Sequence, residues 1–245
     1  MKAARRRTTI HVMALPAEKR VPYVDDLAAE ATSDVKHEWL DGEVWAMAGG
    51  TPEHSALAAS VTIALGNALR GRPCRVFSSD LRIRIPEAGL ATYPDVAVVR
   101  GRLETHPEDP DAATNPVVIV EVLGDSTEAI DRGKKLSHYR RLASLREVVF
   151  VSQHEPRLER YHRGDDGRWV LDEAGPGEAV ELATIGARLA VDDVYFDPLA
   201  AGCGGGGGRR ASRPRSTAAA EATRWISVSM ARRPVRVVPR QRKAA

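Results

Sequence analysis

The sequence predicts a mixed α/β protein in which helices flank a central sheet. Short apolar runs rich in β-branched residues alternate with two stretches of helical spacing, in the order strands, helix, strands, helix, strands. Such an order is typical of a mixed sheet with helices on its faces. The pairs Asp41-Gly42 and Asp166-Gly167 lie between strand-like segments and predict hairpins near the two ends of the domain. We find no internal repeat.

Each element is predicted from a local pattern. A short helix is expected over residues 23–31, and two strands within residues 35–47 surround the first Asp-Gly turn. Thr51 is expected to cap the next helix, because threonine is a favoured N-cap and Pro52 suits the first helical position. The apolar stripe of this helix comprises Leu57, Ala58, Val61, Ala64, Leu65 and Ala68. Later elements are strands at 75–78, 80–85, 93–99, 117–123 and 148–151, a helix at 127–143, and a hairpin of 158–162 with 168–171.

Composition divides the chain into three parts. From Ala200 onward there are 11 basic residues and one acidic residue, a net charge of +10, whereas the remainder has 25 basic and 32 acidic residues, a net charge of −7. We predict a partly disordered leader (1–21), a folded domain (22–198) and a disordered Gly/Arg-rich tail (199–245). The tail is either an arm that grips phosphates or an unselected extension. Because the body is acidic, a pI of about 9.0 is not evidence that the domain binds nucleic acid.

The sequence also predicts a cytoplasmic protein that does not enter a membrane. No apolar run approaches the roughly 20 residues of a membrane span, and the basic N-terminus lacks the apolar stretch of a signal peptide. The two cysteines, Cys74 and Cys203, are far apart and offer neither a disulfide framework nor a zinc site.

Two acidic residues in apolar runs are the main functional candidates. Asp95 lies in Tyr-Pro-Asp-Val-Ala-Val-Val and Glu121 in Val-Val-Ile-Val-Glu-Val-Leu. A buried carboxylate needs a cation, hydrogen bonds or a catalytic task, because burying it unpaired costs several kcal/mol. Two such strands suggest a shared metal. The structural alternatives are a strand-end cap for Asp95 and a salt bridge to arginine for Glu121.

The second predicted helix can supply a cation to the same pocket. Asp131, Lys135 and Tyr139 follow at intervals of four residues and share one helix face, whereas Lys134 lies on another face. Lys135 is therefore the candidate catalytic lysine. The structural alternative is an exposed pair between Asp131 and Lys135, which would be worth a few tenths of a kcal/mol.

Other polar residues are weaker candidates for the site. His54 lies on the buried stripe of its helix, where it is either a catalyst or a hydrogen-bonded core histidine. Glu38 could reach the pocket from the N-terminal hairpin, and Asp80 opens a strand. A phosphate-facing patch could be formed by Arg82, Arg84, Arg140 and Arg141.

Taken together, these segments resemble a known family. The chain is similar, over roughly residues 22–198, to the Uma-type restriction endonucleases (the Uma2 family), a branch of the PD-(D/E)XK nuclease superfamily. The matching segments are His37 to Val44, Glu53-His54, Tyr93 to Val96, Val120 to Leu123 with Asp125 to Thr127, and Asp131 to Lys135 with Tyr139. Leu123 stands where the superfamily usually has its lysine.

The resemblance implies a restriction-endonuclease-like core and a Mg²⁺-dependent endonuclease that acts on DNA, with Mn²⁺ as a substitute. Asp95, Glu121 and the Val122 carbonyl would bind the metal, and the missing lysine would be replaced by Lys135. By the same resemblance, Glu38 would assist catalysis. From the residues themselves we also expect His54 to take part in catalysis and Asp80, Asp131 and Tyr139 to support the site. A homodimer is compatible with the sequence. The alternatives are a nuclease-fold protein that binds nucleic acid without cutting it, and a structural or partner-binding domain in which Glu121 and Lys135 merely pair.

Overall fold

The computed structural model describes residues 20–47, 49–124, 128 and 131–199. The predictions for residues 1–19 and for the tail from residue 200 therefore lie outside the described residues, as does part of the helix predicted from residue 127. Among the residues that are described, no helix has the length and apolar character needed to cross a membrane.

A six-stranded mixed sheet forms the centre of the fold, in the order β12-β11-β10-β9-β6-β3. Its middle strands β9 and β10 run parallel, and its other neighbours run antiparallel. This arrangement confirms the predicted mixed sheet. The strands are β3 (Cys74–Ser78), β6 (Val96–Arg100), β9 (Pro116–Leu123), β10 (Glu147–Ser152), β11 (Leu158–Arg163) and β12 (Trp169–Ala174).

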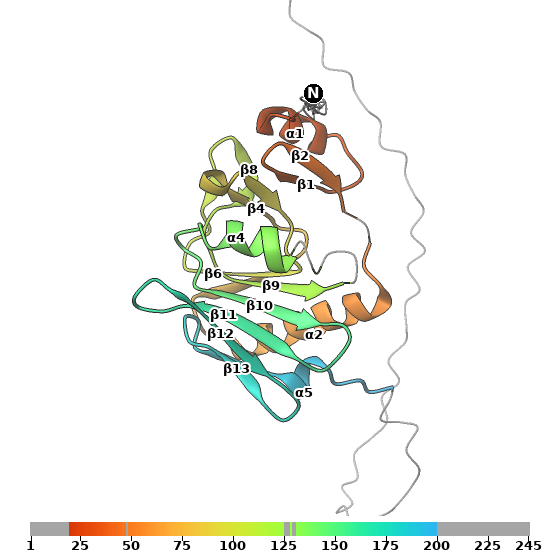
Figure 1. The fold of residues 1–245 in the computed structure, drawn as a ribbon, viewed down its shortest axis with the longest axis vertical. Helices are drawn as coiled ribbons and strands as arrows, with labels where there is room; N and C mark the ends of the chain where they lie inside the picture. The colour runs from red at the N-terminus through yellow and green to blue at the C-terminus, as the bar shows by residue number, and fades with distance from the viewer. Residues whose placement is uncertain (1–19, 48, 125–127, 129–130, 200–245) are drawn as a thin grey trace, which may run out of the picture. The chain divides into compact units, whose positions relative to one another are not determined.

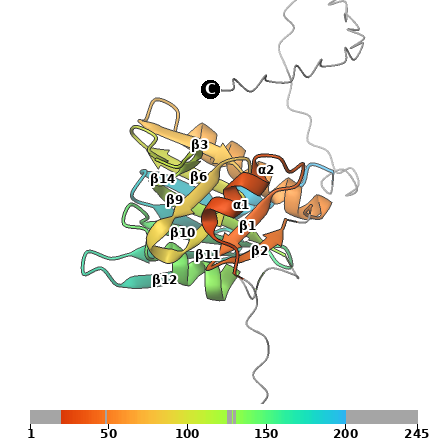
Figure 2. The same cartoon turned by 90° about the horizontal axis from the view of Figure 1, so that it is seen from above.

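A second sheet has the order β2-β1-β5-β4-β8-β7, and a separate hairpin pairs β13 with β14. In Figure 1, α1 (Tyr23–Glu30), β1 and β2 lie above the central sheet, and in Figure 2, which looks down from above, they lie toward the viewer. The strands of the second sheet are β1 (His37–Leu40), β2 (Glu43–Ala46), β4 (Arg82–Ile85), β5 (Leu90–Thr92), β7 (Thr105–His106) and β8 (Asp109–Ala113). The hairpin consists of β13 (Ala179–Leu182) and β14 (Ala187–Ala190).

Two apolar cores cover the two faces of the central sheet. On one face, Val118, Val120 and Val122 of β9 pack with α2, the β13–β14 hairpin and α5. On the other face, Ile119 and Leu123 pack with α4 and strands β4 and β5. Because side chains alternate along a strand, Glu121 faces this second core. The helical elements are α1 (Tyr23–Glu30), α2 (Pro52–Ala68), η1 (Pro86–Ala88), η2 (Asp131–Lys135), α4 (Leu136–Tyr139) and α5 (Val191–Val194).

Several local predictions are confirmed and others are wrong. Thr51 caps α2 as predicted, since its hydroxyl accepts a hydrogen bond from the His54 amide at 3.1 Å. The helix predicted to reach residue 143 instead consists, in its described part, of a π-helical turn followed by α4, which ends at Tyr139. The predicted phosphate-facing patch is also wrong, because Arg82 and Arg84 are buried.

Candidate active site

The two strand carboxylates meet because β6 and β9 are antiparallel neighbours. Val96 pairs with Val120, so Asp95, just before β6, lies beside Glu121. The amide of Asp95 donates to Glu121 Oε2 at 3.3 Å, and the amide of Val122 donates to Asp95 Oδ2 at 2.7 Å. Each carboxylate is thus fixed by the neighbouring strand's backbone.

Lys135 supplies a buried cation beside these carboxylates. Its Nζ lies 2.8 Å from Glu38 Oε1, 3.1 Å from Asp131 Oδ1 and 3.6 Å from Glu121 Oε1. Its side chain is 9% exposed, whereas that of Lys134 is 62% exposed and lies against Trp45. The helix faces predicted for the two lysines are therefore confirmed.

The helical segment that carries Lys135 has an unusual local geometry. Residues Asp131–Lys135 form a π-helical turn before the regular turn of α4, and such turns are frequent at functional sites. At the end of α4, the fully buried hydroxyl of Tyr139 donates to Glu121 Oε1 at 2.5 Å. Asp131, Lys135 and Tyr139 consequently converge around Glu121, as their spacing predicts.

Glu38 reaches the site from the hairpin formed by β1 and β2. Asp41 and Gly42 both adopt positive φ, at 50° and 92°, as the tight turn of a two-residue hairpin requires. The hydroxyl of Thr92 on β5 donates to Glu38 Oε1, the same oxygen that contacts Lys135. The neighbouring strand of the same sheet therefore fixes the Glu38 carboxylate against the lysine.

His54 enters the site from the N-terminal turn of α2. Its Nε2 lies 3.2 Å from Asp95 Oδ2, and the ring also hydrogen-bonds to the backbone of Val122. The hydrogen bond to Asp95 raises the pKa of His54 above its ordinary value. The two interpretations left open by the sequence, a catalyst and a hydrogen-bonded core histidine, both agree with these contacts.

Negative charge exceeds positive charge in this group, which we call the Glu121 cluster: Glu38, Asp95, Glu121, Asp131 and Lys135. Burial is the largest influence on the pKa of Glu121 and raises it. The attraction of Lys135 does not offset burial together with the repulsion of Asp131 and Asp95. Burial alone would lower the pKa of Lys135, but Glu121, Glu38 and Asp131 outweigh it and raise that pKa. The lysine therefore stays protonated, while the cluster retains surplus carboxylates.

Two further polar residues, Thr92 and Gln153, support the site. The side-chain amide of Gln153 donates to the Leu123 carbonyl at 2.9 Å, and its oxygen accepts from the Thr51 hydroxyl at 2.8 Å. Gln153 thus ties the start of α2 to the end of β9. Neither residue was predicted from the sequence. For Gln153 a signal existed, because the parallel β9–β10 pair brings the C-terminal ends of these strands to one edge, and Gln153 directly follows β10.

Asp80 does not join the Glu121 cluster in the contacts of the described residues. Its carboxylate is 86% exposed and lies 2.5 Å from Lys36 Nζ. The described contacts of Asp80 therefore give no support to its predicted role in the site.

The residues present fit a hard divalent cation. All contacts described for the Asp95 carboxylate fall on Oδ2, so Oδ1 is available as a ligand. In the described part of the chain, no three His, Cys, Asp or Glu side chains are arranged to hold a metal by themselves. Mg²⁺ is commonly bound through one or two carboxylates and keeps several waters. Asp95, Glu121 and the Val122 carbonyl form an oxygen donor set of that kind.

Comparison with known proteins identifies relatives of this chain. A family model named Uma2 and described as "Putative restriction endonuclease" matches residues 23–192. One uncharacterized protein of Synechocystis sp. is 37% identical over 163 residues, 65% of this chain and 83% of the relative. A second from the same organism is 30% identical over 171 residues, 70% of this chain and 96% of the relative.

A solved structure shares the fold. The chain matches a crystal structure described as "a putative nuclease belonging to DUF820" from Anabaena variabilis, with a TM-score of 0.55 and 15% identity. The match covers 66% of this chain and 91% of the solved chain.

Proposed function

Because the chain belongs to the Uma2 family, described as "Putative restriction endonuclease", we propose that it is a Mg²⁺-dependent endonuclease that hydrolyses phosphodiester bonds in DNA. The observation that carries the proposal is the enclosure of one buried lysine by three carboxylates, beside the Asp95–Glu121 pair. Surplus buried carboxylates are costly unless a cation joins them. Asp95, Glu121 and the Val122 carbonyl would hold that cation.

When bound, Mg²⁺ would supply neutralisation of the negative charge that develops on the phosphate. Lys135 would hold a fixed positive charge beside the same phosphate oxygens, where a preorganised cation is most effective in a site that excludes water. Its raised pKa suits this electrostatic role and makes it a poor proton acceptor at neutral pH. Asp131 would keep the ammonium group in place.

Glu38 is a better candidate than Lys135 for the general base that takes a proton from the attacking water. It is the carboxylate closest to Lys135, and Thr92 orients it. His54 would position Asp95 through the contact of Nε2 with Oδ2, and Tyr139 would position Glu121. His54 and Tyr139 are therefore positioning residues, and each holds one carboxylate of the cluster in place.

The proposal is tested by incubating the full chain with single- and double-stranded DNA and RNA in Mg²⁺, Mn²⁺ or EDTA. We expect cleavage of DNA with either metal and none with EDTA. Asp95→Asn and Glu121→Gln should remove cleavage without unfolding the protein, because each keeps its shape while losing a negative charge. Cleavage that persists in EDTA, or in both variants, would contradict the proposed site.

A further inference from the structure

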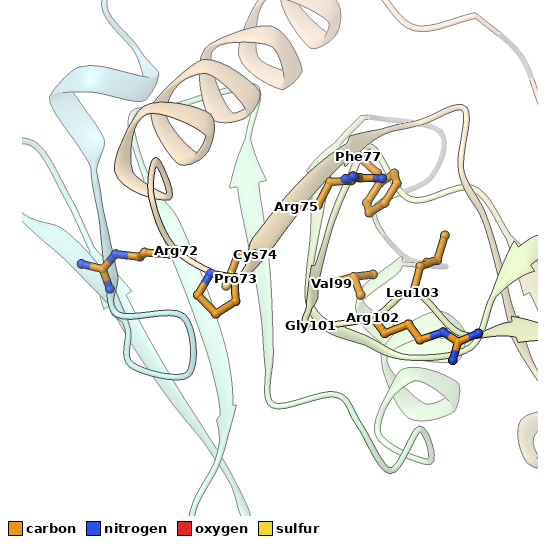
Figure 3. A pocket seen from close by; sticks show the side chains of 9 residues that line it. All are labelled: Arg72, Pro73, Cys74, Arg75, Phe77, Val99, Gly101, Arg102 and Leu103. Atoms are coloured by element: carbon orange, nitrogen blue, oxygen red, sulfur yellow. The ribbon is translucent and has the colours of Figure 1, made fainter.

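A hollow of about 380 Å³ lies at the outer edge of the central sheet, where β3 begins and β6 ends. Figure 3 shows Arg75, Phe77, Val99, Arg102 and Leu103 grouped around it, with Arg72 set apart. The volume falls within the roughly 300–1,000 Å³ typical of small-molecule sites. We call this hollow the edge pocket.

The edge pocket is positively charged. Arg72, Arg75 and Arg102 are exposed, and none of them forms an ion pair with another described residue. Arg72 does donate a hydrogen bond to the Ile185 carbonyl at 3.1 Å. The sequence before residue 200 carries a net charge of −7, so an arginine group without carboxylates is a local exception. A guanidinium fork matches the oxygens of a phosphate in pairs.

An aromatic ring lies beside these arginines. The guanidinium carbon of Arg75 is 6.0 Å from the centre of the Phe77 ring, and Phe77 and Leu103 are partly exposed in the pocket wall. Proteins that bind single-stranded nucleic acid combine a basic groove with aromatic side chains on which bases stack. An acidic peptide would pair with the arginines but would not need an aromatic ring to stack on.

The edge pocket also shares a sheet face with the Glu121 cluster. Arg75 pairs with Val99, and Phe77 pairs with Ala97, along the β3–β6 ladder. Ala97 packs in the core on the Glu121 side, and alternation places Asp95 and Val99 on that side as well. Asp95 and Val99 are four positions apart along the chain, a distance of about 13 Å in a β-strand. A few nucleotides of single-stranded DNA span that distance.

We propose that the edge pocket binds one nucleotide of a single-stranded segment, with its phosphate on Arg75 and Arg102 and its base against Phe77. The inference rests on the proposed function, since it takes this nucleotide to belong to the strand whose phosphate lies at Asp95 and Glu121. It extends that function by naming an unstacked strand, rather than an intact duplex, as the partner of this face. The edge position of β3 leaves the pocket open to such a strand.

The test measures binding of a labelled single-stranded DNA oligonucleotide to the full chain by fluorescence anisotropy in EDTA, over a series of salt concentrations. The double variant Arg75→Ala/Arg102→Ala should bind more weakly, and its log–log salt slope should be shallower by about 0.7, because the two arginines contact one phosphate and each phosphate neutralised on a single strand contributes about 0.7. Arg168→Ala, an exposed arginine that already pairs with Asp166, is the matched control and should leave the slope unchanged.

A second pair of variants isolates the ring. Phe77→Leu should weaken binding of the single strand about fivefold or more, since it removes a base-stacking surface, whereas Phe77→Tyr should keep wild-type affinity. A duplex of the same sequence should not distinguish Phe77→Leu from wild type, because its bases are already stacked. Equal loss with the duplex would contradict base stacking in the pocket.

Cleavage measured separately with Mg²⁺ distinguishes the two proposals. If the wild type cleaves DNA and the arginine double variant binds with wild-type affinity and slope, the edge-pocket proposal is overturned and the nuclease proposal stands. If nothing is cleaved but the pocket variants lose binding, the pocket is supported and the nuclease proposal fails.

Discussion

Among the described residues, the Glu121 cluster and a second cluster of buried charge differ in how completely they are paired. In the cluster we call the Arg82 cluster (Tyr23, Asp26, Arg82, Arg84 and Asp109), two arginines face two aspartates. Arg82 lies 2.5 Å from Asp26 and 3.4 Å from Asp109, and the Tyr23 hydroxyl donates to Asp109 at 2.5 Å. In the Glu121 cluster, three carboxylates surround a single lysine, and the fourth, Asp95, lies 3.2 Å from His54.

The difference separates a structural cluster from a functional one. Arg84 completes the balanced set by stacking 3.9 Å from the centre of the Tyr23 ring and donating to the Leu90 carbonyl at 2.9 Å. Because two arginines balance two aspartates, the Arg82 cluster can link α1 to β4 and β8 without a bound ligand. The Glu121 cluster retains net negative charge in a buried place, which is tolerable when a cation completes it.

The largest effect that tests this contrast is on stability. Arg82→Met keeps most of the side-chain volume but leaves Asp26 and Asp109 buried without their cation. We expect the free energy of unfolding to fall by about 3–5 kcal/mol, the usual cost of breaking a buried pair from one side. Chemical denaturation measures this loss. In the fraction that remains folded, DNA cleavage should change by less than about tenfold, and loss of cleavage alone would contradict a structural role.

The next effect concerns the cation of the Glu121 cluster. Lys135→Ala should lower the rate of DNA cleavage about 100-fold or more, the scale of losing one preorganised charge-stabilising group, while Mg²⁺ binding persists. Single-turnover cleavage and calorimetric titration together check both parts. A variant that cleaves at the wild-type rate would show that the lysine serves only to pair with its neighbours.

The Glu121 cluster was more predictable from the sequence than the Arg82 cluster, for a physical reason. A carboxylate within a run of β-branched residues, such as Glu121, is predicted to be buried from its immediate neighbours in the sequence. The spacing of Asp131, Lys135 and Tyr139 places these three residues on one helix face. In contrast, Arg82 and Arg84 alternate with apolar residues and resemble the exposed face of a strand. Their partners Tyr23 and Asp26 lie in α1, more than 50 residues earlier, and Asp109 lies in β8, so no local pattern indicates them.

The same limit explains the missed strands and supporting residues. Strands β5 and β7 are only three and two residues long, too short for alternation to be recognised. Strand β8 begins Asp-Pro-Asp, a sequence typical of turns. Thr92 and Gln153 act through contacts with segments distant in the sequence, so only the assembled sheets reveal them.

A smaller effect is expected from pH in the absence of metal. Burial raises the pKa of Glu121 to about 8, above that of an unfolded glutamate near 4.3. The folded state therefore binds this proton more tightly, and its contribution to stability is present at low pH and is lost as pH rises through about 8. Between pH 6 and 8 the loss should be on the order of 2 kcal/mol, since each pKa unit corresponds to about 1.4 kcal/mol.

Chemical denaturation at several pH values in EDTA checks this trend. Glu121→Gln cannot titrate at this position and should show a flatter dependence than the wild type over the same range. Saturating Mg²⁺ should also flatten the wild-type curve, because a bound cation favours the ionised carboxylate. A stability that rises between pH 6 and 8 in EDTA would contradict the surplus of negative charge.

The smallest effect is expected at the neighbouring lysine. Lys134→Ala removes the same charge one position earlier, but its ammonium group is exposed and lies 4.0 Å from Glu43. Cleavage should change by less than about tenfold, a difference of at most 1.4 kcal/mol in activation free energy. If Lys134→Ala is inactive and Lys135→Ala is active, the assignment of the catalytic lysine is wrong.

The most direct test of the contrast between the clusters is calorimetric titration of the full chain with Mg²⁺. The wild type should release a saturable binding heat, and Asp95→Asn and Glu121→Gln should each abolish it without a change in the folded far-ultraviolet spectrum. Asp80→Asn makes the same chemical change at an exposed carboxylate outside the cluster and should titrate as the wild type does. Titration curves for Asp95→Asn and Glu121→Gln that match the wild type would contradict a metal site in the Glu121 cluster.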